Sequence, residues 1–226
     1  HKSDPDGGAV AQLSYITGIH PPVAVGRPEF FSSGRALNGH MPSGVRMILR
    51  QLRNSADGLY IVVVGAARDL AEALAREPEL FSEKCRGIYL NIGSGSPDPA
   101  LVKAPEWNVK LDPAGFAQIF RAPCPIFWMP CLQDEAGSGD LHSREFGTHY
   151  RFRQGDILED LPKSMRNYFG WMYTRDSSST WLEALGGDFE RLLAEKGEEY
   201  RMMYSTGSFF DLAGLCVTRS GQLLSK

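Results

Sequence analysis

The sequence contains no hydrophobic run long enough to cross a membrane. Its longest apolar stretch, Leu59 to Ala67, is far shorter than the ~20 residues that a membrane-spanning helix requires, and Gly65 interrupts it. We therefore expect a soluble protein with no membrane partner.

An excess of positive charge is also missing. Lysine and arginine number 24 against 27 aspartates and glutamates, which gives a net charge of −3 at pH 7. Proteins that bind nucleic acids concentrate positive charge, because they displace counterions from the phosphates. The charge balance therefore predicts no nucleic-acid partner.

Cysteine is scarce, and no two cysteines form a CxxC pair. The four residues lie in apolar segments: Cys85, Cys124, Cys131 and Cys216. This pattern favours buried free thiols over a disulfide framework or a zinc site. Free thiols favour a reducing compartment such as the cytoplasm.

Because the chain begins with His1, we expect a tag remnant, a processed end or a trimmed fragment, from which a targeting signal can already be missing.

Two common catalytic motifs are absent. No GxSxG elbow is present, which argues against an α/β hydrolase with a serine nucleophile. The glycine-rich stretch GSGSPDP at 93–99 lacks a Lys-Ser/Thr pair, and no good helix follows it directly. We therefore do not expect a phosphate-binding loop there.

Apolar content is sufficient for a sizeable core. The 226 residues are 42% hydrophobic and 11% aromatic, and a chain of this length fits one large domain. We predict a single domain over residues 1–226, with a helical carboxyl-terminal part from about residue 156.

Strands and helices alternate through the middle of the chain. Continuous apolar runs at 59–65, 87–93 and 124–130 predict strands, and amphipathic segments at 66–80 and 112–122 predict helices between them. Strands that are apolar on both faces and joined by helices form parallel crossovers in a covered sheet. The predicted fold class is α/β, with a doubly wound, mostly parallel sheet flanked by helices.

Ligands of such a sheet bind at the carboxyl ends of its strands. The loops after Val64, Gly93 and Pro130 are therefore the expected site. The other predicted elements are helices at 8–16, 43–53, 161–173, 180–195 and 208–217, a short buried strand at 23–26, and a loop or flap at 137–155.

Three acidic stretches could carry chemistry, and two of them have a structural interpretation as well. Asp4 and Asp6 lie on a glycine-rich turn, which suits either a hard cation or a helix N-cap at the surface. Asp211 begins an apolar segment, either as a helix charge or as a ligand at a pocket wall. If the EWN stretch is a strand, Glu106 and Asn108 share one face of it.

Taken together and in this order, these stretches resemble the inosine-uridine preferring nucleoside hydrolase family. The matching segments are DPDGGAVAQL, VVVGAARDLAEAL, YLNIGSG, EWNVKLDPAGFAQIF and FFDLAG. The match is most convincing from about Pro22 to Pro130, and EWN followed by DPAGFAQIF is its most specific part. The resemblance implies a nucleoside hydrolase-like fold, and symmetric homo-oligomers are common in that family.

The resemblance also implies a chemistry, the hydrolysis of the N-glycosidic bond of a nucleoside by water activated on a calcium ion. It assigns calcium binding to Asp6, Asp211 and the backbone carbonyl of Val64. Catalysis and substrate binding fall to these residues: Asp4, Asp6 and Asn108 as catalytic, and Glu106, Asn108, Trp107, Asn38 and Phe210 as contacts of the nucleoside or ribosyl ligand.

Several positions depart from the family pattern. Gly7 stands where the second aspartate of the pair is expected, Lys2 stands near the position of the base, and Phe210 replaces a histidine. The alternative function is therefore a catalytically degenerate member that binds a small ligand or a protein partner.

Overall fold

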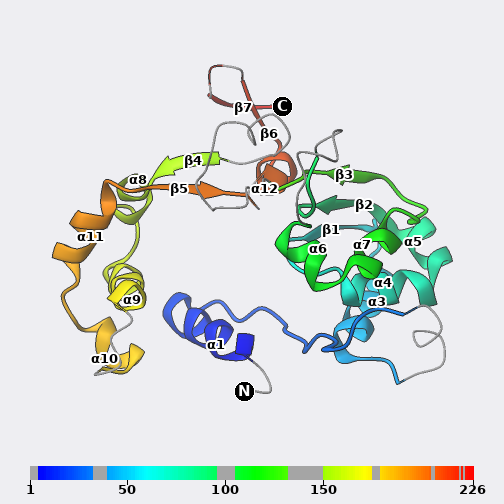
Figure 1. Cartoon of the computed structure of the whole chain (residues 1–226), viewed down its shortest axis with the longest axis horizontal. Helices are drawn as coiled ribbons and strands as arrows, with labels where there is room; N and C mark the ends of the chain where they lie inside the picture. The colour runs from blue at the N-terminus through cyan, green and yellow to red at the C-terminus, as the bar shows by residue number, and fades with distance from the viewer. Residues whose placement is uncertain are drawn as a thin grey trace. The chain divides into compact units, whose positions relative to one another are not determined.

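The computed structural model describes most of the chain, and every structural statement below concerns these residues. They are 5–32, 40–95, 105–131, 150–174, 179–204, 207–218, 220 and 222–226, without the side chains of Pro5, Asp6 and residues 190–193. The chain forms two compact units, each built from two separate stretches (Figure 1). The sheet unit comprises Ala24–Tyr150 and Tyr204–Lys226, and the helical unit comprises His1–Val23 and Arg151–Met203. The prediction of a single domain stays a prediction.

The sheet unit contains a parallel sheet of three strands. Its order is β1-β2-β3, with Val63 of β1 opposite Leu90 of β2, and Leu90 opposite Trp128 of β3. The bounds of the first elements are α3 (Ser43–Asn54), β1 (Leu59–Val63), α4 (Arg68–Arg76), α5 (Pro78–Lys84) and β2 (Cys85–Leu90). Those that follow are α6 (Trp107–Leu111), α7 (Pro113–Ile119), β3 (Ile126–Trp128), α12 (Gly207–Leu212), β6 (Leu215–Val217) and β7 (Leu223–Ser225).

The predicted fold class is confirmed, because the sheet is parallel and helices flank it. The helix predicted at 66–80 is two helices, and Pro78 is the reason. Proline lacks the N–H that would continue α4, and it suits the first position of a new helix, α5.

One face of the sheet holds the hydrophobic core. Side chains of β1 and β2 pack there with residues of α3, α4, α5 and α7. The fully buried members include Leu49, Leu52, Leu74, Phe81, Ile88, Leu90 and Ile119. The amphipathic pattern of α3, in which Val45, Leu49 and Leu52 face inward, explains why this helix matches its predicted bounds closely.

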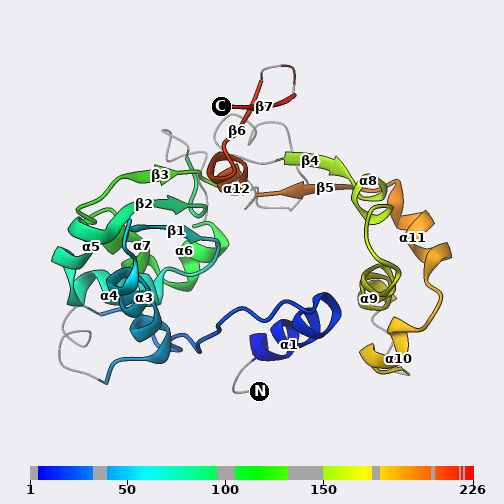
Figure 2. The ribbon, with the colours of Figure 1, turned by 180° about the vertical axis from the view of Figure 1, so that it is seen from behind.

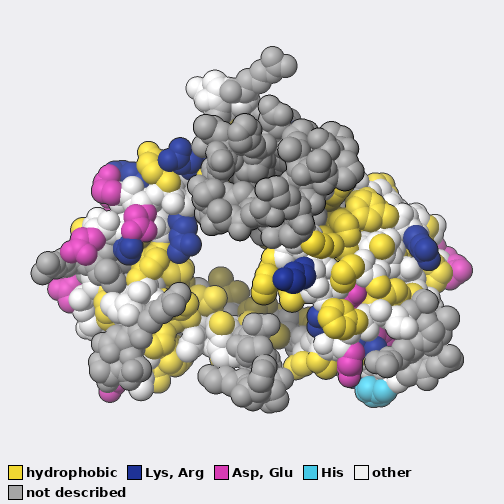
Figure 3. Space-filling view, viewed as in Figure 1, with side chains coloured by type: hydrophobic (Ala, Val, Ile, Leu, Met, Phe, Trp, Pro, Cys, Tyr) yellow, Lys and Arg dark blue, Asp and Glu magenta, His cyan; other side chains and the backbone are white. Residues whose placement is uncertain are grey.

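The other face of the sheet carries a row of aromatic side chains. Tyr89 stacks on Phe127 with ring centroids 4.7 Å apart, and Tyr60 follows at 5.8 Å from Tyr89. Tyr60 and Phe127 are about two-fifths exposed. Hydrophobic side chains also gather on the face of the sheet unit that is turned to the viewer in Figure 3.

The buried strand predicted at 23–26 is wrong. Val23 and Val25 are more than half exposed, and the segment has no regular structure. Its backbone is held by hydrogen bonds outside a sheet, since Gly44 N donates to Val25 O over 3.0 Å and Arg27 N donates to the Asp69 carboxylate over 3.1 Å. A Cβ atom on Gly26 or Gly44 would lie 2.5 or 2.7 Å from the Asp69 carboxylate, so this close approach requires glycine.

A buried group of ions joins this segment to α4. Glu72 is fully buried and lies between two arginines, with Arg27 Nε at 2.7 Å and Arg76 Nη2 at 2.8 Å. Burying a carboxylate costs several kcal/mol unless it is paired. The two arginines therefore compensate the cost of burying the Glu72 carboxylate.

The helical unit is built around short helices. Its elements are α1 (Pro5–Thr17), α8 (Gln154–Leu158), α9 (Lys163–Thr174), α10 (Trp181–Leu185) and α11 (Glu190–Gly197), with the two-stranded sheet of β4 (Tyr150–Arg153) and β5 (Tyr200–Met203). The reverse view in Figure 2 shows the same elements from behind. None of the described helices is long and apolar enough to span a membrane.

Two predicted helices are shorter than expected, and glycines account for both corrections. The helix predicted at 180–195 divides at Gly186 and Gly187 into α10 and α11. The helix predicted at 208–217 ends at Leu212, because Gly214 adopts φ +71° and the chain turns into β6. Of the loop predicted at 137–155, residues 137–149 lie outside the described residues, and its end forms β4 and the start of α8.

We predict that Glu72→Ala lowers the free energy of unfolding by about 3–5 kcal/mol, because it leaves Arg27 buried without its counter-charge. Urea unfolding followed by far-ultraviolet circular dichroism measures the change. Glu83→Ala on the exposed side of α5 is the matched control and should change stability by less than about 0.5 kcal/mol. Equal shifts in the two variants would contradict the structural role of Glu72.

Candidate functional site

The predicted site residues divide between described and undescribed parts of the chain. Asp4 and Asn38 lie outside the described residues, as does the side chain of Asp6 at the start of α1. The others belong to the sheet unit: Val64, Glu106, Trp107, Asn108, Phe210 and Asp211. The site is therefore described from the sheet unit alone.

The sequence suggested a strand for Glu106 and Asn108, but the two residues do not lie on one. Glu106 is the N-cap of α6, and its Oε1 accepts hydrogen bonds from Asn108 N at 3.0 Å and Asn108 Nδ2 at 3.1 Å. Free N–H groups at a helix start attract a side-chain oxygen, so the EWN stretch folds as a capped helix. The two side chains are in contact within this helix cap and not on a shared face of a strand.

The other oxygen of Glu106 reaches the end of β2. Oε2 accepts from Gly93 N at 3.1 Å and from Val109 N at 3.3 Å. Four N–H groups thus hold a carboxylate that is only 6% exposed. Among the described residues, no arginine, lysine or histidine pairs with it. Glu106 is a buried negative charge at the carboxyl end of the sheet.

Asn91 follows directly on β2 and is almost fully buried. Its Nδ2 donates to Val63 O at 3.3 Å and to Ser208 Oγ at 3.1 Å, which brings α12 to this end of the sheet (Figures 1 and 2). Asn91 Oδ1 accepts no hydrogen bond within the described part of the chain, and Ser94 Oγ is likewise buried without a partner. Buried polar atoms without partners are uncommon and often indicate a bound water or ligand.

Cys131 closes the same end of the sheet. Its Sγ donates to Asn91 O at 3.2 Å and is buried. Burial raises the pKa of the Cys131 thiol to about 12, and the nearby Glu106 carboxylate adds to this effect. The thiol therefore stays protonated at neutral pH and is unsuited to nucleophilic attack. We call Asn91, Ser94, Glu106, Asn108 and Ser208 the sheet-end cluster.

Asp211 lies on α12, one turn beyond Ser208. Its carboxylate accepts a hydrogen bond from Tyr89 Oη and forms an ion pair with Lys226 Nζ. The Lys226 ammonium group, and secondly the Tyr89 hydroxyl, lower the pKa of Asp211. Burial, and secondly the Asp211 carboxylate, raise the pKa of Tyr89 to about 12.

The described residues do not by themselves fit a calcium ion. Calcium takes six to eight oxygen ligands, usually with several carboxylates. Within the described ranges no group of three histidine, cysteine, aspartate or glutamate residues forms. Asp211 is already neutralised by Lys226, and of the other expected ligands only Val64 is described. The calcium site stays a prediction that depends on Asp4 and Asp6.

Two aromatic residues were predicted to contact the substrate. Trp107 is 64% exposed on α6, next to the cap formed by Glu106. Phe210 packs edge-to-face against Tyr150, with ring centroids 4.8 Å apart. Both substrate-binding assignments stay predictions.

Four polar residues of this region were not predicted as site residues from the sequence. They are Tyr89, Asn91, Cys131 and Ser208. A signal was available for Asn91, since an asparagine within the apolar run GIYLNIG requires a hydrogen-bonding partner when the strand is buried. Ser208 gave no comparable signal, because its partner lies 117 residues away.

We predict that the raised pKa of Tyr89 makes the sheet unit lose stability as the pH becomes strongly alkaline. The folded state keeps Tyr89 protonated, so its contribution is complete below pH 10 and is lost as the pH rises from about 10 to 12. Melting temperatures measured between pH 9 and 11.5 should fall more steeply for the parent than for Tyr89→Phe. Tyr60→Phe on the exposed part of the same row is the control and should behave as the parent. Parallel curves for parent and Tyr89→Phe would refute the prediction.

Comparisons with known proteins give a distant structural likeness. No protein-family model and no curated protein matches the sequence. The chain is similar to an inosine-uridine preferring nucleoside hydrolase from Bacillus anthracis, with a TM-score of 0.41 and 15% identity. It is also similar to a purine-preferring ribonucleoside hydrolase from Gardnerella vaginalis, with a TM-score of 0.37 and 15% identity. Each match covers 83% of this chain but only 58% and 57% of those chains, so neither their activity nor their substrates follow for this chain.

Proposed function

We propose that the chain is a nucleoside hydrolase and that the sheet-end cluster binds the ribosyl part of its substrate. The observation that carries this proposal is the Glu106 carboxylate, which is buried, held by four N–H groups and free of any described cation. The EWN and DPAGFAQIF stretches, which resemble those of nucleoside hydrolases, support the same conclusion.

The unpaired polar atoms of the cluster suit a sugar. Asn91 Oδ1 is an acceptor without a donor, and Ser94 Oγ can both donate and accept. Ribose carries adjacent hydroxyl groups that supply both kinds of partner. A hydroxylated ligand would therefore satisfy atoms that are costly to leave buried and unpaired.

The buried carboxylate suits the charge that develops during the reaction. Cleavage of an N-glycosidic bond passes through an oxocarbenium-like sugar with positive charge near C1′. A negative group fixed in a water-poor site stabilises such a charge without having to reorganise. Glu106 is fixed in this way, because backbone N–H groups of α6 and of Gly93, in the loop after β2, determine its orientation.

The overall reaction balances with water as the only second reactant. The bond between C1′ and the base nitrogen breaks, and a bond forms between C1′ and the water oxygen. The water loses a proton, the departing base gains one, and the products are ribose and the free base. We propose Asp4 or Asp6 as the acceptor of the proton from water and Asn108 as a group that orients the sugar.

The function predicts ribose release from inosine or uridine by the purified chain. Glu106→Gln should lower kcat roughly 10²–10³-fold, because it removes the fixed negative charge. Glu83→Gln, the same change on the exposed side of α5, is the matched control and should leave the rate unchanged.

Two further measurements distinguish a loss of activity from a loss of structure in these variants. Circular dichroism shows whether Glu106→Gln keeps the parent's structure, and Asn108→Ala tests the cluster while leaving the Glu106 carboxylate and its three backbone N–H donors in place. Release of ribose that is equal in the parent and in a folded Glu106→Gln variant would overturn the proposed role. Saturable inosine binding by the parent without any release would favour a binding scaffold instead.

Calcium is a separate proposal that rests on the amino-terminal aspartates. Calorimetric titration with calcium should show uptake by the parent and its loss in Asp6→Ala and in Asp211→Ala. Chelation should then abolish ribose release. Absence of uptake by the parent would remove the ion from the proposed mechanism and leave the role of Glu106 to be decided by the rate measurements.

A further inference from the structure

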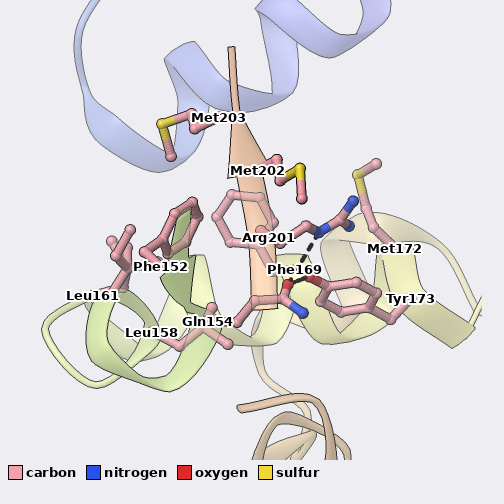
Figure 4. A pocket seen from close by; sticks show the side chains of 11 residues that line it. Phe152, Gln154, Leu158, Leu161, Phe169, Met172, Tyr173, Arg201, Met202 and Met203 are labelled. Atoms are coloured by element: carbon pink, nitrogen blue, oxygen red, sulfur yellow. Dashed lines mark hydrogen bonds between the residues drawn. The ribbon is translucent and has the colours of Figure 1, made fainter. Parts of the chain in front are cut away.

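The helical unit contains a cavity of about 650 Å³ that the proposed function does not use. Side chains from β4, β5, α8 and α9 line it, and Figure 4 shows them from close by. Sites for small molecules in proteins usually measure ~300–1,000 Å³. The cavity is therefore of the size that holds one small ligand.

Most of the cavity wall is apolar and adaptable. Aromatic and aliphatic side chains supply one part of it, and methionines supply another: Phe152, Leu158, Phe169, Met172, Met202 and Met203. Methionine is unbranched and polarisable, so it adjusts to irregular apolar ligands. Such a wall suits a flexible hydrocarbon chain better than a rigid polar molecule.

A fixed polar group stands within this apolar wall. Gln154 is only 5% exposed, and its Oε1 accepts hydrogen bonds from Tyr173 Oη and from Arg201 Nε, the latter at 3.3 Å. Its Nε2 donates to Lys196 O at 3.3 Å, which fixes the amide. Figure 4 shows Gln154, Tyr173 and Arg201 converging.

Arg201 is held in place at one edge of its guanidinium group. Nε is bound by Gln154, and the group lies 5.8 Å from the centre of the Tyr173 ring. Among the described residues, no carboxylate forms an ion pair with Arg201. Arg153, at the end of the neighbouring strand, is by contrast paired with Asp156 and Glu198.

The terminal N–H groups of Arg201 are thus available beside an apolar cavity. A guanidinium group binds a carboxylate through two parallel hydrogen bonds. A neutral hydrocarbon would leave the positive charge of Arg201 without a counter-ion, and a cationic amphiphile would be repelled by that charge. A small polar anion would leave the apolar wall uncovered.

We propose that this cavity binds a fatty-acid-like monocarboxylate. The carboxylate pairs with Arg201, and the hydrocarbon chain lies along the methionine and phenylalanine wall. This ligand matches the charge and the lining of the cavity together, and its binding is independent of the proposed hydrolase activity.

Calorimetric titration of the whole chain with dodecanoate, below its micelle concentration, tests the proposal. Dodecanoate should bind with a stoichiometry of one, and dodecanol should bind roughly ten- to a hundredfold more weakly, as expected for the loss of a charge-assisted hydrogen-bond pair. Arg201→Gln should reduce dodecanoate affinity to that of dodecanol and leave dodecanol binding unchanged.

Two further variants separate the cavity from general surface binding. Arg151→Gln is the matched control, because Arg151 stacks on Tyr200 at 4.2 Å and does not line the cavity. It should bind dodecanoate as the parent does. Met172→Trp, at a half-exposed position of the wall, should weaken dodecanoate and dodecanol alike by filling space.

Three results would overturn the proposal. They are no saturable binding of dodecanoate, equal affinities for dodecanoate and dodecanol in the parent, and equal losses in Arg151→Gln and Arg201→Gln. Circular dichroism of each variant establishes that a loss of binding does not come from unfolding. Arg201 is an exposed residue, so its replacement is not expected to disturb the fold.

Discussion

The carboxylate of Asp112 accepts hydrogen bonds from two backbone N–H groups, Phe31 N at 2.7 Å and Gly115 N at 2.8 Å. The first lies 81 residues away in a segment without regular structure, and the second belongs to the helix that Asp112 caps. A fully buried carboxylate is unfavourable unless such donors surround it. Asp69 and Glu106 use the same interaction, at Arg27 N and at Gly93 N. Carboxylates bound to backbone N–H groups, buried at Asp112 and Glu106 and half-buried at Asp69, therefore hold the irregular segments of the sheet unit to its helices.

This interaction explains what the sequence could and could not predict. The three strands and α3 follow from apolar runs and helical spacing, which are local properties of the chain. The segment at 23–26 is also apolar, yet it is not a strand, because Asp69 and Gly44 bind its backbone from distant positions. Likewise, the alternation of Glu106 and Asn108 is compatible with a strand. Only the N–H groups that converge on Glu106 distinguish a cap from a strand, and one of them comes from the β2 loop.

The candidate site shows the same limit. Glu106, Asn108 and Asp211 could be proposed from the sequence, since acidic and amide residues in apolar surroundings stand out. The sequence did not indicate the link from Asn91 to Ser208, or that from Tyr89 to Asp211, because these join parts of the chain more than 100 residues apart. Nor could it predict that Lys226 forms an ion pair with Asp211, the residue predicted as a metal ligand. The neighbours of a residue in the sequence indicated its chemistry, but they did not indicate its hydrogen-bond or ion-pair partner.

The order of the two units along the chain has a consequence for biosynthesis. The helical unit needs α1 from the start of the chain, where Gln12 accepts a hydrogen bond from Tyr168 Oη of α9, 156 residues later. The sheet unit in turn needs α12, which follows the last strand of the helical unit. Neither unit is complete until β5 has been made, and the sheet unit also requires the segment that follows Met203. The sheet unit, which has begun long before the last strand of the helical unit is made, is therefore completed only after that strand, so the simple order in which the amino-terminal domain folds first does not apply to these two units.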